Sequence, residues 1–167
     1  TCLDKSFFES LPKVPRLNLI NSCMGYKSAN LIGSISSEGV PNVAVFSSIT
    51  HLGSDPALLG FILRPPTVPR HTYSNIKEAK YFSVNAIAES FMSEAHQTSA
   101  NYSEEVSEFE ATGIEAEWKF GIEVPFVKDS PVQLLCKYLN EYIIQENGTL
   151  HVIASIEKIF VNEELLN

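Results

Sequence analysis

The sequence predicts a mainly β fold, an antiparallel β-barrel with short helical insertions. Strand candidates outnumber helix candidates, and turn signals join several of them as hairpins. Two or three short helices are expected, of which two can be bounded, at 73–80 and 89–96. Six or more strands are expected, the clearest at 30–36, 40–50, 57–63, 81–87, 132–145 and 149–161. Because 167 residues is an ordinary length for one domain, residues 1–167 are predicted to form a single one.

Turn residues connect the predicted strands. The segments 37–39 and 146–148 each contain a glycine between two β-branched runs, and Asn-Gly in the second favours the tight turns that hairpins need. Residues 53–56 predict a turn before the third strand, 57–63, whose near-continuous hydrophobicity indicates burial on both faces. Three prolines within residues 64–70 exclude a helix or a central strand, so an ordered loop is expected there.

The chain carries 12 basic and 20 acidic residues, a formal net charge of −8 at pH 7. A nucleic-acid binder needs a surplus of Lys and Arg, so nucleic acid is not an expected partner. The charge is uneven, +3 over residues 1–77 and −11 over residues 78–167, which leaves room for a local anion site in the first half. The longest apolar run, 57–63, is far shorter than the roughly 20 residues of a membrane-spanning helix.

The cysteines and the N-terminal segment predict a cytoplasmic location. The three cysteines are widely spaced and odd in number, which favours reduced thiols over a disulfide framework. No basic segment followed by an apolar one resembles a signal peptide. We therefore expect a cytoplasmic protein with no membrane segment.

The spacing of glycine and histidine excludes several familiar sites. No two of the eight glycines are two positions apart, so the dinucleotide-binding G-x-G-x-x-G motif does not occur. The same spacing rules out a P-loop and the G-x-S-x-G nucleophile elbow. The four histidines lie at least 20 residues apart, so no helical metal-binding pair can form. A histidine site assembled in space stays open as an alternative, but nothing in the sequence supports it and no metal is expected.

Two of the three arginines, Arg64 and Arg70, flank the proline-rich loop that leads into the first predicted helix. Thr72 stands at the expected N-cap of this helix. Helix N-termini present unpaired N–H groups and a partial positive charge. Because Thr72, Ser74 and Asn75 would add side-chain donors, the segment predicts a phosphate site. The alternative is a capped surface helix with two solvated arginines.

A cluster of hydroxyls ends the second predicted strand, at Ser47, Ser48 and Thr50. A strand running out to solvent would look the same. Together with other segments in a fixed order, however, this run resembles the flavin reductase-like family, which includes flavoredoxin and the reductase components of two-component monooxygenases. The resemblance covers about residues 25 to 161 and rests on the segments 33–36, 41–48, 54–61, 64–76 and 81–85.

This resemblance implies an FMN-binding split β-barrel with Greek-key antiparallel topology. It also implies that FMN lies in a groove at the interface of a homodimer. The positions implied along the flavin ring and ribityl chain are Ser47, Ser48 and Thr50. Those implied on the phosphate side are Arg64, Thr72 and Asn75.

Three further cofactor-binding positions are implied, two of them with an explicit alternative. Asn85 resembles the family's strand asparagine, but a buried structural hydrogen bond would explain it equally well. Residues 95–102 occupy the place of a loop that covers the flavin in the family, which makes His96 and Ser99 candidates. The alternative for His96 is a helix-capping or surface histidine.

The resemblance implies an NAD(P)H:flavin oxidoreductase, in which hydride passes from NADH or NADPH to N5 of the flavin. The cofactor carries this chemistry, so no catalytic side chain is assigned. Two alternatives are a flavoredoxin-like electron carrier and a non-catalytic flavin-binding dimer. The partner implied is a monooxygenase or an electron-transfer protein.

Two features depart from the family pattern. Many relatives continue through a further C-terminal segment that helps complete the site, so the resemblance implies that such a segment is missing after Asn167. The stretch Glu104–Glu117 holds six acids and no base, which predicts a solvated surface. Near the mouth of a flavin site it would disfavour NADPH through repulsion of the additional phosphate.

Overall fold

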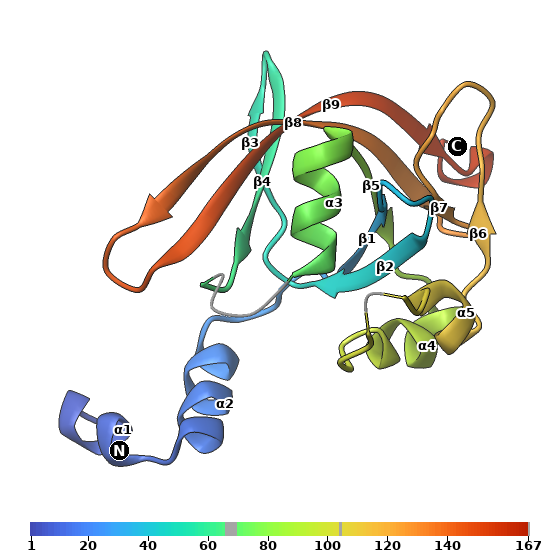
Figure 1. Ribbon diagram of the computed structural model, residues 1–167. Helices are drawn as coiled ribbons and strands as arrows, with labels where there is room; N and C mark the ends of the chain where they lie inside the picture. Colours follow the sequence, from blue (N-terminus) through green and yellow to red (C-terminus); the bar gives the residue numbers. More distant parts are fainter. Residues whose placement is uncertain (66–69, 104, 167) are drawn as a thin grey trace.

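The computed structural model describes residues 1–65, 70–103 and 105–166. Its centre is a seven-stranded sheet of antiparallel neighbours, in the order β2-β1-β5-β8-β9-β4-β3 (Figure 1). A second sheet has two short strands, β6 (Ala116–Glu117) and β7 (Phe126–Val127). The strands of the main sheet are β1 (Asn30–Ile35), β2 (Pro41–Phe46), β3 (Thr50–Ser54), β4 (Ala57–Leu63), β5 (Tyr81–Ala86), β8 (Val132–Ile144) and β9 (Thr149–Val161). The mainly β, antiparallel fold class is confirmed.

Short helices occupy the connections between strands. In Figure 1, α3 lies against the sheet beside β1 and β2, while α4 and α5 lie together beside β2. The α-helices are α1 (Lys5–Ser10), α2 (Lys13–Cys23), α3 (His71–Ala79), α4 (Met92–Gln97) and α5 (Glu108–Thr112). Two single turns of 3₁₀ helix are η1 (Glu89–Phe91) and η2 (Glu163–Leu165).

Two hydrophobic clusters position the helices that carry the site. In the first, Phe61 packs edge-to-face against Phe46 and Phe82, with ring centroids 5.4 and 5.7 Å apart. Ile76 of α3 is buried in the same cluster, so α3 is fixed on the sheet. In the second, Phe109 anchors α5 in a cluster with residues of β1 and β2. Burial of one such side chain stabilises the fold by about 1.5–3 kcal/mol.

The predicted hairpins are confirmed. β1 pairs with β2 across residues 36–40, and β8 pairs with β9 across the Asn147-Gly148 turn. Gly148 has a φ of +70°, a left-handed conformation in which a side chain would be strained. Asn147 fixes the turn through its side-chain oxygen, which accepts a hydrogen bond from the Thr149 N–H at 3.0 Å. β4 is buried on both faces at its centre, as its sequence predicts.

Several boundaries differ from the sequence prediction. The predicted strand at 40–50 ends at Phe46, and a separate strand, β3, begins at Thr50. The break occurs where the Ser48 side chain hydrogen-bonds backbone groups of Ile62 in place of a strand neighbour. The predicted turn at 53–56 is shorter, because Gly53 and Ser54 belong to β3.

The first residue of α3 is also corrected. The helix begins at His71, so the N-cap is Arg70 and not Thr72, which lies within the first turn. Proline-rich residues precede the helix, and 66–69 of the predicted ordered loop lie outside the described residues. The second predicted helix, at 89–96, is a 3₁₀ turn followed by α4.

The N-terminal arm, defined here as residues 1–27, contains α1 and α2, which the sequence reading did not predict. Neither helix buries any residue, and both extend away from the sheet (Figure 1). Within the described residues, no helix combines the length and the hydropathy that crossing a membrane requires. The arm therefore contributes little to the packing of the chain that carries it.

Candidate functional site

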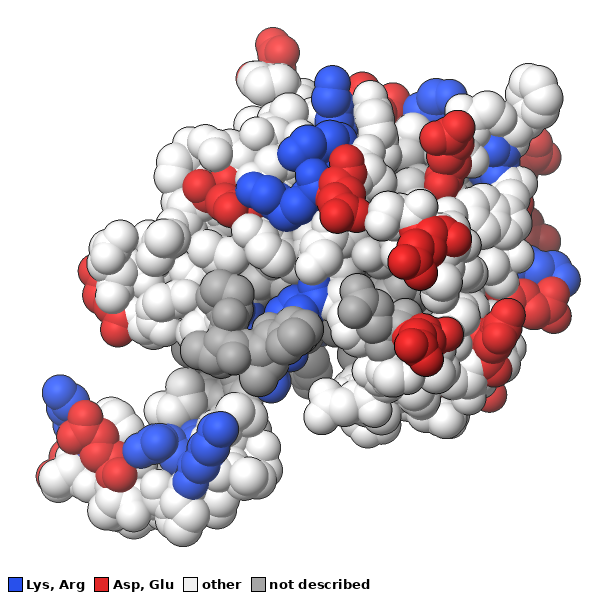
Figure 2. Space-filling view, in the orientation of Figure 1, with Lys and Arg blue, Asp and Glu red and all other residues white. Residues whose placement is uncertain are grey.

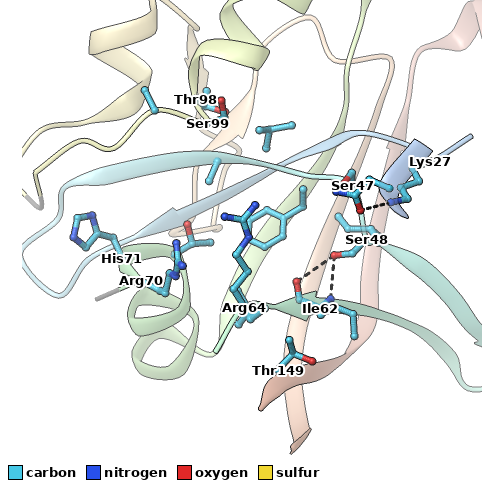
Figure 3. Close-up of a pocket in the computed structure, with 18 of the residues that line it drawn as sticks. Lys27, Ser47, Ser48, Ile62, Arg64, Arg70, His71, Thr98, Ser99 and Thr149 are labelled. Carbon is cyan, nitrogen blue, oxygen red and sulfur yellow. Dashed lines mark hydrogen bonds between the residues drawn. The ribbon is translucent and has the colours of Figure 1, made fainter. Parts of the chain in front are cut away.

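A cavity of about 1040 Å³ opens where β2, β4 and α3 end or begin. Its walls come from the polar segment after β2, the end of β4, the first turn of α3, the segment after α4 and the start of β9 (Figure 3). The N-terminal arm adds part of a further wall. Of the candidate residues inferred from the sequence, those that line this cavity are Ser47, Ser48, Thr50, Arg64, Thr72 and Ser99.

The first turn of α3 faces the cavity with unpaired donors. The Ser74 N–H donates to the Arg70 carbonyl at 3.0 Å, and among the described residues no side chain caps the helix, so the N–H groups of residues 71–73 have no partner within the helix. Arg64 and Arg70 line the cavity next to this turn (Figure 3). Together the turn and the two guanidinium groups can bind an anion.

Arg70 is incompletely satisfied. Its Nε atom is buried, and among the described residues it has no hydrogen-bond partner. A buried donor without a partner costs about 1–3 kcal/mol, more for a charged group, so such atoms often belong to a binding site. Arg70 ends the proline-rich loop, and the burial of its Nε atom in the cavity wall makes it a stronger candidate for anion binding than its sequence position suggests.

Beneath the α3 turn lies a buried network of polar side chains. The Thr72 hydroxyl donates to Asn42 Oδ1 at 2.9 Å, and the Asn42 amide donates to Glu108. The Ser34 hydroxyl also donates to Asn42 Oδ1, at 3.3 Å, and Asn75 donates to Ser34 at 3.1 Å. Because a hydroxyl has one proton, Thr72 presents lone pairs to the cavity and not the donor expected from the sequence.

Glu108 corrects the prediction that residues 104–117 form a solvated surface. The carboxyl group belongs to α5, is 7% exposed and lines the cavity. Burial raises the pKa of Glu108, opposed by hydrogen bonds, including that from the Asn42 amide, and by the charge of His71. Burial also leaves the neighbouring Ser107 hydroxyl without a partner among the described residues.

The hydroxyl cluster after β2 is only partly free. The Ser48 hydroxyl donates to the Ile62 carbonyl at 3.2 Å and accepts from the Ile62 N–H at 3.1 Å (Figure 3). This side chain holds the segment after β2 against β4, so its proton is already engaged. Ser47 and Thr50 are exposed at the cavity wall. The structure shows no hydrogen bond from either hydroxyl to another described residue.

Three candidate residues do not line the cavity: Asn75, Asn85 and His96. Asn85 is fully buried, where its amide donates to the Leu31 carbonyl at 3.1 Å and its oxygen accepts from the Val127 N–H at 3.0 Å. Buried structural hydrogen bonds of this kind are the alternative given for Asn85 in the sequence prediction. His96 is exposed in the last turn of α4, as the surface alternative describes.

Sequence reasoning missed Asn42, the residue at the centre of the buried network. An asparagine in an otherwise apolar strand is unfavourable unless its amide is satisfied, so its place in β2 was a usable signal. Glu108 had no such signal, because its burial results from the packing of Phe109. Among the described residues, no group of three or more His, Cys, Asp or Glu side chains could hold a metal ion.

Comparisons with known proteins agree with this geometry. A family model described as flavin reductase like domain matches residues 26–167. A split-barrel protein from Shewanella frigidimarina, assigned as a flavin reductase, is 38% identical with a TM-score of 0.95, covering 100% of this chain and 83% of that one. The 2-nitrobenzoate 2-nitroreductase of Pseudomonas fluorescens is 26% identical with a TM-score of 0.83, covering 99% and 78%.

Two further comparisons extend the picture. Component B of nitrilotriacetate monooxygenase from Bacillus cereus shares the fold with a TM-score of 0.85 at 20% identity, covering 99% of this chain and 83% of that one. An uncharacterised protein of Aquifex aeolicus is 28% identical over 114 residues, which are 67% of this chain and 58% of that protein, so the match spans less than two thirds of this relative. With the family model matched over most of the chain, and the split barrel shared with these structures, the chain belongs to the flavin reductase-like family.

Proposed function

We propose that the chain binds FMN in the cavity and acts as an NAD(P)H:flavin oxidoreductase. Membership of the family supports a flavin-linked oxidoreductase or electron-transfer function. The observation that carries the choice of a phosphorylated flavin is Arg70, whose buried Nε has no partner in the described part of the chain and lies beside the first turn of α3. A phosphate group would satisfy both.

The residues of the cavity fit FMN by chemistry and by size. The unpaired amides of α3 and the guanidinium groups of Arg64 and Arg70 would bind the phosphate. Ser47 and Thr50 would donate to the ribityl chain or to the ring. A cavity of about 1040 Å³ lies at the upper end of the range for cofactor sites and leaves space for a second molecule over the flavin.

Bound FMN would supply the redox chemistry, accepting two electrons as hydride from the nicotinamide, which is thereby oxidised. The chain's own contribution is to orient the flavin through the two ends of the cavity and to leave one face open. No side chain needs to transfer a proton at a fixed atom for this step. The electrons would then pass to a monooxygenase or another electron-transfer protein.

We further propose a homodimer in which the N-terminal arm packs on a second copy. Helices as short as those of the arm are marginal without packing. The arm exposes the large apolar side chains of Phe7, Val14, Leu17, Ile20 and Met24. It holds four basic and two acidic residues, whereas residues 28–167 have a net charge of −10. Figure 2 shows acidic side chains spread over the body of the molecule, a surface that complements a basic arm.

Light scattering coupled to size-exclusion chromatography tests the dimer. We expect Val14→Asp and Ile20→Asp to shift the protein from dimer to monomer, and Asn18→Asp on the same exposed helix to leave it dimeric. A monomeric wild-type protein would contradict this part of the proposal.

A cytoplasmic location is proposed as well, because all three cysteines are free.

Anaerobic reduction tests the activity. The protein loaded with FMN should lose its visible flavin absorbance rapidly on addition of NADH or NADPH. Absorbance that disappears only when a reduced protein donor is added would favour the electron carrier. A protein that takes up no FMN at micromolar concentration would refute the proposal altogether.

A further inference from the structure

Glu108 is a buried carboxyl group in the wall of the cavity for which flavin chemistry provides no obvious use. It belongs to α5, which Phe109 holds against β1 and β2. Its carboxylate accepts a hydrogen bond from the Asn42 amide, and the side chain is 7% exposed. Burying an ionisable group in this way is costly, which makes its presence beside an anion site informative.

The carboxylate lies close to the first turn of α3. A single amide group, that of Asn42, separates Glu108 from the Thr72 hydroxyl. Two hydrogen bonds and one amide span no more than about 8 Å. A carboxylate this close to the helix turn repels a phosphate dianion bound at that turn, because the site is partly buried.

The hydrogen-bond directions in this network act in the same sense. Because the Asn42 amide donates to Glu108, its oxygen faces Thr72 and accepts the Thr72 proton. The Thr72 hydroxyl therefore cannot donate to a phosphate. Glu108 thus opposes anion binding through its charge and through the orientation that it imposes on Asn42.

Positive groups nearby limit this effect without removing it. His71, on α3, interacts favourably with the Glu108 charge, and Arg70 lines the same cavity. β2 carries no titratable residue, and α4 carries Glu94 and His96.

We propose that Glu108, through its charge and its hydrogen bond to Asn42, weakens binding of the flavin phosphate at the α3 turn. It thereby favours exchange of FMN over permanent retention. This inference rests on the proposed function, because it assumes that the phosphate occupies the α3 turn. Glu108 would then limit the affinity of the site for the phosphate.

Replacement of Glu108 by Gln tests the inference. Gln can still accept a hydrogen bond from Asn42 but carries no charge. We expect Glu108→Gln to bind FMN about tenfold more tightly, as measured by quenching of flavin fluorescence, and to change the Kd for riboflavin, which has no phosphate, less than twofold. Glu110→Gln removes the same charge from an exposed position on the same helix and should leave both Kd values within twofold.

The ratio of the two Kd values separates the outcomes. An unchanged or weakened affinity for FMN in Glu108→Gln, or an equal gain for riboflavin, would overturn the inference. If Glu108→Gln lacks the native circular dichroism spectrum, Glu108→Ala decides by the same ratio, and an unchanged ratio there would also overturn it.

The pH profile provides a second readout. The difference in FMN affinity between wild type and Glu108→Gln should disappear as the pH falls and the Glu108 carboxyl becomes protonated, whereas a purely structural role would keep it constant. Titration of the phosphate itself affects both proteins and cancels in the comparison. Wild-type protein that binds neither FMN nor riboflavin would count against the proposed function itself.

Discussion

Arg70 offers the sharpest test of how the cavity recognises its ligand. Replacing Arg70 by Ala removes a guanidinium group whose buried Nε has no partner among the described residues. A hydrogen bond to a charged group contributes about 1.5–3 kcal/mol, so its loss should raise the Kd for FMN about 10- to 150-fold. Arg70→Lys keeps the charge but loses the planar donor pair, and we expect an intermediate Kd.

Titration of flavin fluorescence against FMN and riboflavin measures this effect. Riboflavin cannot use the phosphate contact, so its Kd should change less than about twofold in Arg70→Ala. Arg16→Ala is a matched control, because Arg16 is exposed on α2 and its side chain bonds only the Glu9 carbonyl, at 3.3 Å, among the contacts that the structure shows. If Arg70→Ala retains the native circular dichroism spectrum and the FMN-to-riboflavin ratio does not change, the assignment of the phosphate to this turn is wrong.

Four other predictions concern binding and stability. Arg64→Ala should raise the Kd for FMN about three- to tenfold in the same titration, less than Arg70→Ala because the side chain is exposed, and an unchanged value would remove Arg64 from the site. Thr72→Val should lower the free energy of unfolding in urea by about 1 kcal/mol, since the donor to Asn42 is lost; a gain in stability would contradict the network. Phe61→Ala should cost about 3–5 kcal/mol in the same assay, and a loss below 1 kcal/mol would show that its cluster is not the core. At Glu141, burial raises the pKa, but hydrogen bonds from three neighbouring side chains outweigh burial and lower the pKa overall. The stabilisation from this carboxylate is therefore present above the unfolded pKa and lost as the pH falls. Glu141→Gln should show a shallower loss of stability than wild type from about pH 5 to pH 3, and parallel curves would refute this.

The strands and hairpins could be predicted from the sequence because their signals are local. Alternation, β-branched runs and the Asn147-Gly148 turn act between neighbouring residues, and the structure confirms five of the six strand candidates with shifts of at most one residue at their ends, whereas 40–50 is divided between β2 and β3. The break at Ser48 could not be predicted, since it depends on contact with Ile62, fourteen residues away. The N-terminal helices were missed because their apolar residues form no clear stripe that would indicate a buried face.

The candidate site was predicted in outline and corrected in its details. The arginines and the helix after the proline-rich loop come together as expected, because the chain order alone brings them close. The direction of the Thr72 hydrogen bond and the burial of Glu108 depend on tertiary packing by α5. Asn85 was a candidate because it resembles the family's strand asparagine, with a buried structural hydrogen bond as the alternative, and the structure shows three such hydrogen bonds at its side chain.

Uptake and reduction of FMN test the central claim most directly. The purified protein, incubated with FMN and freed of unbound flavin by rapid gel filtration, should carry about one FMN per chain and lose its visible absorbance when NADH or NADPH is added without oxygen. A colourless protein that quenches no flavin fluorescence at micromolar FMN would contradict the claim that this cavity is a flavin site.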